Sequence, residues 1–175
     1  AGRRARLVFL LTGRGVLRTA NVILAAGSGT RMKSDLPKVL HPLLGRPMVV
    51  WAVEMAEAVG DQPPVLVVGH GKEQVKALLG GRAEFVEQKE LLGTGHAVQQ
   101  AAPVLQGRAD AVVVTYGDMP LLRAETVRSL VDLFARERQA SAQTALAMLT
   151  VTRDDPQGFG RVVRDAQGEV VRIVE

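Results

Sequence analysis

Residues 21–32 read NVILAAGSGTRM, an apolar run that leads into a glycine-rich turn carrying an arginine. The apolar part, residues 21–26, has the composition of a buried β-strand, and Gly27 and Gly29 follow it directly. In an open parallel sheet, ligands bind beyond the carboxyl ends of the strands. The stretch therefore predicts a central strand with a ligand-binding loop at its end.

Outward from this stretch, short apolar runs alternate with helical patterns. We expect further strands at residues 65–68, 84–86 and 111–115, and helices at residues 47–59, 73–79, 96–105 and 124–140. A hairpin is expected over residues 161–164 and 169–174, around the turn sequence DAQG. Strands of near-continuous apolar character between helices are typical of parallel βαβ units. The sequence therefore predicts an α/β fold with a doubly wound, mostly parallel sheet and helices on both faces.

Composition narrows the classes of site. The chain has 175 residues, of which 47% are hydrophobic and 23% charged, as in an ordinary globular domain. It has no cysteine, which excludes disulfides, a thiolate nucleophile and a cysteine-built zinc site and fits a reducing cytoplasm. The histidines His41, His70 and His96 lack metal-site spacing, and we expect each to be a structural loop or cap residue. Any metal should be a hard ion on carboxylates.

The positive charge of the chain is concentrated near its start. The net charge is +4, yet residues 1–20 alone hold five arginines and no acid, so residues 21–175 are close to neutral. One Trp, one Tyr and four Phe offer few stacking platforms, and we expect no nucleic-acid partner. No apolar stretch approaches the roughly 18 residues of a membrane span, and we expect no membrane partner. Residues 1–20 are expected to be a disordered basic extension, with an extra structured element as the alternative. Because the chain lacks an initiating Met and stops abruptly at its last strand, we expect a piece of a longer protein.

The loop after the first strand has the chemistry of a phosphate site. Its glycines allow close backbone approach, and successive N–H groups in such a loop form an anion-binding hollow. Arg31 and Lys38 follow, a guanidinium that can clamp phosphate oxygens and a mobile ammonium. Neither the Walker pattern nor the G-x-G-x-x-G fingerprint is present, which excludes P-loop kinases and dinucleotide enzymes.

Three motifs carry a family resemblance. They are L-A-A-G-x-G-T-R-M at residues 24–32 with P-K at 37–38, Gln88 with L-G-T-G-H-A at 92–97, and Y-G-D-M-P at 116–120. From about residue 21 to 175 the chain resembles the sugar-nucleotide pyrophosphorylases, most closely the uridylyltransferase half of bifunctional bacterial enzymes that make UDP-N-acetylglucosamine. The resemblance implies a Rossmann-like fold of the nucleotide-diphospho-sugar transferase type, here truncated before its C-terminal part. It also implies a cytoplasmic role in peptidoglycan and cell-shape maintenance. For the parent protein it implies a C-terminal β-helix acetyltransferase domain, absent here, that forms a homotrimer.

The resemblance also assigns roles to individual residues. It implies catalytic roles for Arg31 and Lys38 and a Mg2+ ligand at Asp118, whose second family ligand, an Asn, comes after the end of this chain. The residues implied in nucleotide binding are Leu24, Ala25, Ala26 and Gly27, with Gln88, Gly93 and Thr94 recognising uracil. Those implied in sugar binding are Tyr116, Gly117, Gly160 and Glu175. Ser28 departs from relatives that carry Lys, which predicts one charge fewer near pyrophosphate.

The implied reaction transfers a uridylyl group from UTP to N-acetylglucosamine 1-phosphate, giving UDP-N-acetylglucosamine and pyrophosphate. A phosphomonoester has a second pKa of about 6, so the nucleophile is already anionic and needs no general base. This agrees with the structural roles expected for the histidines. Two alternatives stay open: another sugar-phosphate nucleotidyltransferase of the same fold, or a non-catalytic nucleotide-sugar-binding regulatory domain.

Overall fold

The described residues, 8–11, 17–27, 29–155 and 157–174 of this computed structural model, contain a five-stranded sheet in the order β1-β7-β2-β5-β6. Four of its strands are parallel, β2 (Thr19–Ala25), β5 (Val65–Val68), β6 (Glu84–Glu87) and β7 (Ala111–Tyr116). β1 (Val8–Leu11) pairs antiparallel with β7 at the edge. The predicted α/β class with a mostly parallel sheet is confirmed.

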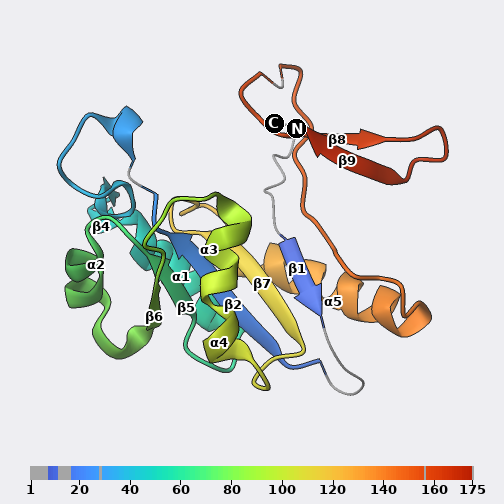
Figure 1. Ribbon diagram of the computed structural model, residues 1–175, viewed down its shortest axis with the longest axis horizontal. Helices are drawn as coiled ribbons and strands as arrows, with labels where there is room; N and C mark the ends of the chain where they lie inside the picture. Colours follow the sequence, from blue (N-terminus) through green and yellow to red (C-terminus); the bar gives the residue numbers. More distant parts are fainter. Residues whose placement is uncertain (1–7, 12–16, 28, 156, 175) are drawn as a thin grey trace.

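The register of the sheet brings the strand ends together. Leu24 of β2 lies opposite Tyr116 of β7, and Ala25 lies opposite Val68 of β5. Val68 in turn pairs with Glu87 of β6. Because the four strands run in one direction, the loops that follow them emerge at a single edge of the sheet (Figure 1). That edge is where a doubly wound fold binds its ligands.

Helices cover both faces of the sheet, as Figure 1 shows. The buried residues of α1 (Met48–Val59), α2 (Lys72–Leu79) and α5 (Ala124–Ala140) pack into one core with Ile23 and Ala25. Those of α3 (Thr94–Gln100) and α4 (Ala102–Leu105) pack into a second core with Val22 and Ala26. The alternation along β2 follows from the twofold period of a strand. The side chains of this strand that face the cores are apolar except for Asn21, which is 3% exposed and donates to the Ala56 carbonyl of α1, and the strand is covered from both sides.

The helix expected over residues 96–105 is divided in two at Ala101. Pro103 lies at the start of α4 and has no N–H with which to continue the helical bonding. The Ala101 N–H instead donates to the Val98 carbonyl at 3.0 Å, a tighter bond than an α-helix makes. The proline was visible in the sequence, and its effect there was overlooked.

The start of the chain differs from the expected disordered extension. Val8–Leu11 forms β1, and β2 begins at Thr19, two residues earlier than predicted. Arg18 anchors this entry, because its guanidinium donates to Asp110 Oδ1 and Oδ2 at 2.9 Å and its carbonyl accepts from the Asp110 N–H at 2.8 Å. The contact therefore ties the start of β2 to the start of β7. Residues 1–7 and 12–16 lie outside the described residues.

Small elements complete the fold. The predicted C-terminal hairpin is confirmed as β8 (Arg161–Arg164) paired with β9 (Val170–Val174), and it stands apart from the sheet in Figure 1. A short hairpin of β3 (Pro42–Leu43) and β4 (Arg46–Pro47) was not predicted. The 3-10 helices are η1 (Thr30–Met32), η2 (Lys38–Leu40) and η3 (Gly80–Arg82). None of the helices in the described ranges is long and apolar enough to cross a membrane.

Candidate active site

A groove of about 610 Å³ lies at the carboxyl edge of the sheet, and we call it the sheet-edge groove. It is bordered by the loop after β2, the segment after β6 and the end of β7. Most of the residues that the sequence nominated line it: Leu24, Ala25, Ala26, Gly27, Arg31, Lys38, Gln88, Gly93, Thr94, Tyr116 and Asp118. Four separate stretches of the chain thus converge on one hollow.

Gly29 and Gly27 of the first loop lack a side chain for different reasons. Gly29 has φ +63°, and a Cβ there would lie 2.7 Å from the Cβ of Lys38. Its missing side chain therefore lets η2 pack under the loop and carry Lys38 to the groove. A Cβ on Gly27 would meet nothing within 4 Å. Gly27 has no structural neighbour to avoid, so the space beside it is free for a ligand.

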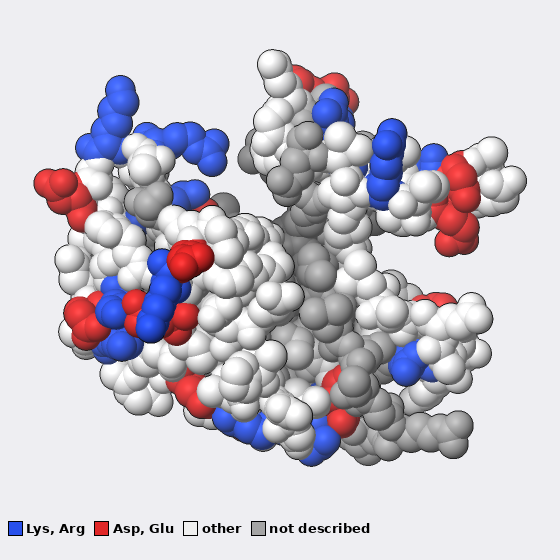
Figure 2. Space-filling view, viewed as in Figure 1, with Lys and Arg blue, Asp and Glu red and all other residues white. Residues whose placement is uncertain are grey.

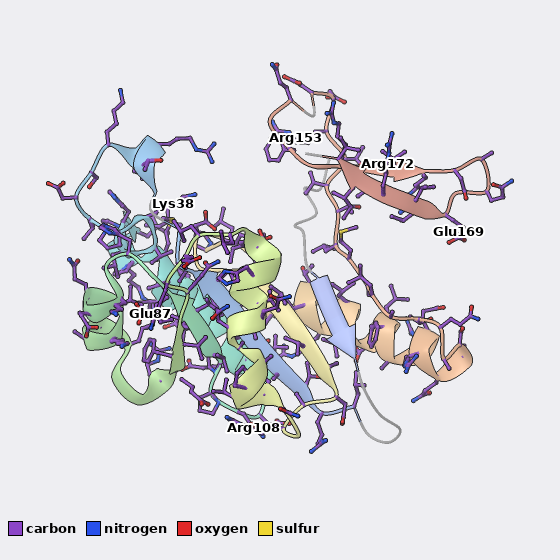
Figure 3. The ribbon with its side chains drawn as sticks, in the orientation of Figure 1. Lys38, Glu87, Arg108, Arg153, Glu169 and Arg172 are labelled. Atoms are coloured by element: carbon purple, nitrogen blue, oxygen red, sulfur yellow. The ribbon has the colours of Figure 1, made fainter. Side chains whose placement is uncertain are left out.

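Lys38 and Asp118 meet across the groove although 80 residues separate them in sequence. The Lys38 ammonium donates to Asp118 Oδ2, and the two side chains are 38% and 29% exposed. Figure 3 shows Lys38 at the end of the sheet where the strands finish. The partial burial keeps each charge close to its partner while both remain reachable from solvent.

Arg31 supplies a second positive charge at the groove. It lies on η1, is exposed, and has no carboxylate partner among the described residues. Figure 2 shows Lys and Arg side chains projecting from the loop that carries η1, at the upper left of the view. Since Asp118 balances one cation, the lining carries net positive charge, which favours an anionic ligand.

Gln88 forms the floor of the groove next to α3. It follows β6 directly, is only 5% exposed, and its backbone N–H donates to the Val68 carbonyl at 2.8 Å. Its Nε2 donates to the Gly93 carbonyl at 3.2 Å and lies 3.1 Å from His96 Nδ1. The amide is therefore held by both the strand and the loop before α3.

An ion pair fixes the strand end beside Gln88. Lys72 Nζ at the start of α2 lies 2.8 Å from Glu87 Oε1 at the end of β6. The hydrogen bond from Lys72 holds the pKa of Glu87 below its ordinary value of 4.5, and the same bond raises the pKa of Lys72 above 10.5. The pair is charged at neutral pH and ties α2 to the strand that carries Gln88.

Some nominated residues do not line the groove. Gly117 lies beside it, where its N–H donates to the Leu24 carbonyl at 2.9 Å and joins the ends of β2 and β7. Gly160 lines a separate hollow of about 390 Å³ with Gln157, Phe159 and their neighbours near β8. Figure 3 places Arg153 and Arg172 of that region far from Lys38. Ser28 and Glu175 lie outside the described residues.

The capacity of the site for metal rests on one carboxylate. The described residues contain no cluster of three or more His, Cys, Asp or Glu side chains that could hold an ion by themselves. Asp118 nevertheless lies on the groove, and Mg2+ is commonly bound by one or two carboxylates together with substrate phosphates and water. The donor set therefore fits a metal that arrives with a phosphate ligand.

Sequence reasoning overlooked the loop after β5. A Cβ on Gly69 would lie 2.8 Å from the Ala26 carbonyl oxygen, and one on Gly71 would lie 2.1 Å from Pro37 Cγ. Because these glycines have no side chains, the loop after β5 packs closely against the chain that follows β2, the adjacent strand. Two glycines after a predicted strand at the same sheet edge were a usable signal for this contact. Leu91 and Val39, which also line the groove, carried no signal beyond their apolar character.

This arrangement defines a class of protein. An α/β domain whose parallel strands end at a glycine turn, a guanidinium without a partner among the described carboxylates and a lysine–carboxylate pair has a groove suited to a phosphorylated ligand. The chain belongs to the MobA-like NTP transferase domain family, whose model matches residues 21–166. The predicted relationship to nucleotidyltransferases is thereby confirmed.

Individual relatives agree with this membership. The bifunctional protein GlmU of Alcanivorax borkumensis is 51% identical over 157 residues, which are 89% of this chain and 33% of that protein. The chain thus spans about a third of the length of the curated relatives it matches. Rv0371c of Mycobacterium tuberculosis, solved with manganese, gives a TM-score of 0.58 at 20% identity, covering 77% of this chain and 71% of that one. CMP:2-keto-3-deoxy-manno-octonic acid synthetase, solved with CTP, gives 0.60 at 23% identity, covering 90% and 64%. The two structures support the Rossmann-like fold.

Proposed function

We propose that the sheet-edge groove transfers a uridylyl group from UTP to N-acetylglucosamine 1-phosphate, releasing pyrophosphate. The observation that carries the proposal is the convergence of Arg31, Lys38 and Asp118 on one groove with the buried amide of Gln88. The relatives named GlmU are about 50% identical to this chain, which agrees with the family resemblance from which the substrate pair and a cytoplasmic role in cell-wall precursor synthesis are proposed. The catalytic unit is assigned to residues 21–175.

The groups of the groove suit in-line displacement at phosphorus. A phosphate oxygen of the sugar phosphate attacks the α-phosphorus of UTP, and the bond to the pyrophosphate oxygen breaks with its electron pair. No side chain has to remove a proton, because the nucleophile is anionic at neutral pH. The work left to the protein is positioning and charge stabilisation, which Arg31 and Lys38 perform at the phosphates.

Asp118 would hold a divalent ion, Mg2+, together with the nucleotide phosphates. The bound ion would add positive charge at the oxygens where negative charge develops. An ion held by Asp118 would compete with Lys38 for the charge of this carboxylate, so Lys38 would be available to a phosphate oxygen. Gly27 gives the nucleotide close access to the backbone, and Tyr116 and Gly117 lie at the adjacent strand end for the sugar. Gly160 and Glu175 keep their proposed sugar contacts as predictions.

Nucleotide binding to the chain tests the proposal directly. Calorimetric titration should show UTP binding more tightly than CTP, ATP or GTP in the presence of Mg2+. Arg31→Ala and Lys38→Met should each weaken UTP binding about 10- to 100-fold while leaving uridine binding unchanged, because each removes a charge-assisted hydrogen bond. Lys33→Met is the matched control, since Lys33 is an exposed cation of the same loop that does not line the groove.

Catalysis supplies the second measurement. Pyrophosphate release from UTP and N-acetylglucosamine 1-phosphate should fall about 100- to 1000-fold in either groove variant, the usual effect of removing one electrostatic partner of the transition state. Glucose 1-phosphate in place of the acetylated sugar tests the substrate. Equal affinity for all four nucleotides, or UTP binding that survives both substitutions, would refute the assignment.

A further inference from the structure

His96 lies at the centre of a hydrogen-bonded row that ends at the sheet-edge groove. It belongs to the first turn of α3 and is partly buried. Its Nδ1 is 3.1 Å from Gln88 Nε2, and its Nε2 is 3.1 Å from Gln100 Nε2. Each amide is also anchored, since Gln88 Nε2 donates to the Gly93 carbonyl at 3.2 Å and Gln100 Nε2 donates to the His96 carbonyl at 3.0 Å.

The imidazole of His96 cannot accept hydrogen bonds from Gln88 and Gln100 at the same time. A neutral imidazole has one N–H donor and one acceptor nitrogen, so only one of the two amide nitrogens can donate to the ring. The other must face a ring N–H or turn away. The ring therefore has to accept from Gln88 through Nδ1 or from Gln100 through Nε2.

Burial decides between the two amides. Gln88 is 5% exposed and has little access to water, whereas Gln100 is partly exposed on the helix and can exchange its ring contact for solvent. An unmet hydrogen bond costs most where water cannot replace it. The low-cost arrangement puts the ring proton on Nε2 and leaves Nδ1 to accept from Gln88.

The accepted hydrogen bond determines what Gln88 offers to a ligand. With both hydrogens of Nε2 directed to His96 and Gly93, the amide cannot rotate without losing two bonds. The carbonyl oxygen Oε1 is then the polar atom left for the groove. An oxygen acceptor matches the N3–H of uracil, while the N3 of cytosine carries a lone pair and would be repelled.

We infer that His96 is a positioning residue that makes the groove select uracil over cytosine by holding the Gln88 amide in one orientation. The inference rests on the proposed function for the nature of the ligand. The hydrogen-bonded row itself is independent of the proposed function, because it is observed in the chain without any ligand.

Two substitutions separate this role from simple packing. Asn places an oxygen near the position of Nδ1, so His96→Asn should keep the acceptor for Gln88 and preserve the UTP-to-CTP affinity ratio. Leu removes the acceptor, and His96→Leu should lower that ratio about tenfold, the effect of one lost orienting hydrogen bond. Gln100→Leu is the control on the same helix, and it should leave the ratio unchanged because it removes only the competing donor.

A spectroscopic measurement tests the row without any nucleotide. Long-range 15N–1H correlation of the ring in the ligand-free chain should show the proton on Nε2 of His96. A proton on Nδ1 would overturn the inference whatever the binding data show. Unfolding curves establish that each variant is folded before its affinities are compared.

The outcomes also distinguish failure here from failure of the proposed function. If wild type prefers UTP and His96→Leu keeps that preference, the inference is wrong and the proposed function stands. If wild type shows no preference for UTP although the proton is on Nε2 of His96, the proposed function fails. The hydrogen-bonded row then exists but has no role in selecting uracil, so the inference is overturned as well.

Discussion

Alanine substitution of the two glycines in the first loop should produce opposite effects. Gly29 adopts φ +63°, where an L-residue costs about 1–2 kcal/mol, and its Cβ would lie 2.7 Å from Lys38 Cβ, which cannot retreat without moving η2. Gly29→Ala should therefore destabilise the chain by about 2 kcal/mol or more, combining backbone strain with overpacking. For a chain of this length that is about 4–8 °C in melting temperature.

Gly27→Ala is the matched comparison. Nothing lies within 4 Å of the added methyl group, and the residue does not have a positive φ, so thermal stability should change by less than about 0.5 kcal/mol. The methyl group would instead occupy groove space, and UTP affinity should fall about tenfold or more. Scanning calorimetry and nucleotide titration on both variants give the four values. The reasoning is refuted if Gly29→Ala is as stable as wild type, or if Gly27→Ala loses stability and keeps its affinity for UTP.

Three further outcomes are expected. Without Mg2+, Asp118→Asn should bind UTP at least as tightly as wild type, because the substitution removes negative charge from the groove. With Mg2+, it should bind UTP about tenfold more weakly than wild type. A substitution that weakens UTP binding equally under both conditions contradicts this. The hydrogen bond from Arg18 holds the pKa of Asp110 below its ordinary 3.8, so the stability it contributes is present above that value and is lost as the pH falls through the lower folded value. In urea titrations, the free energy of unfolding of Asp110→Asn should thus be lower than that of wild type at pH 7, and the difference should disappear in acid. A difference that does not change with pH would exclude the Arg18–Asp110 pair as its cause. Phe134→Ala should cost about 3–5 kcal/mol because the ring is fully buried, whereas Leu133→Ala, 42% exposed, should cost under 1 kcal/mol, and similar losses would mean that α5 packs through another face.

The sheet could be predicted from sequence because its signal is local. The clearest case is β5, an apolar run that is buried along its whole length, and residues 65–68 were located without error. The groove followed from the same reasoning, since parallel strands place their ends at one edge. The division of the helix at Ala101 also had a local signal, Pro103, but the apolar periodicity of residues 96–105 favoured one continuous helix.

Other features depend on contacts that no local pattern encodes. The pairing of Val8–Leu11 with β7 joins segments about a hundred residues apart, and a basic, apolar start has the same composition whether it pairs or not. The close approach of Gly71 to Pro37 also joins residues that are not neighbours in sequence. Gly160 was nominated from resemblance alone; it lines a separate hollow near β8, and its sugar contact stays a prediction.

The pairing of Lys38 with Asp118 has a consequence for how a ligand enters the groove. Two opposite charges that are each about one-third exposed neutralise one another at modest net gain, so the pair is readily exchanged. A triphosphate alone would give Lys38 a new partner and leave Asp118 facing added negative charge. A triphosphate that carries a divalent ion supplies partners to both at once. On the proposed function, the groove should therefore admit the nucleotide together with a divalent ion. Arg31, which has no partner among the described carboxylates, would be the charge that attracts this complex before the pair opens.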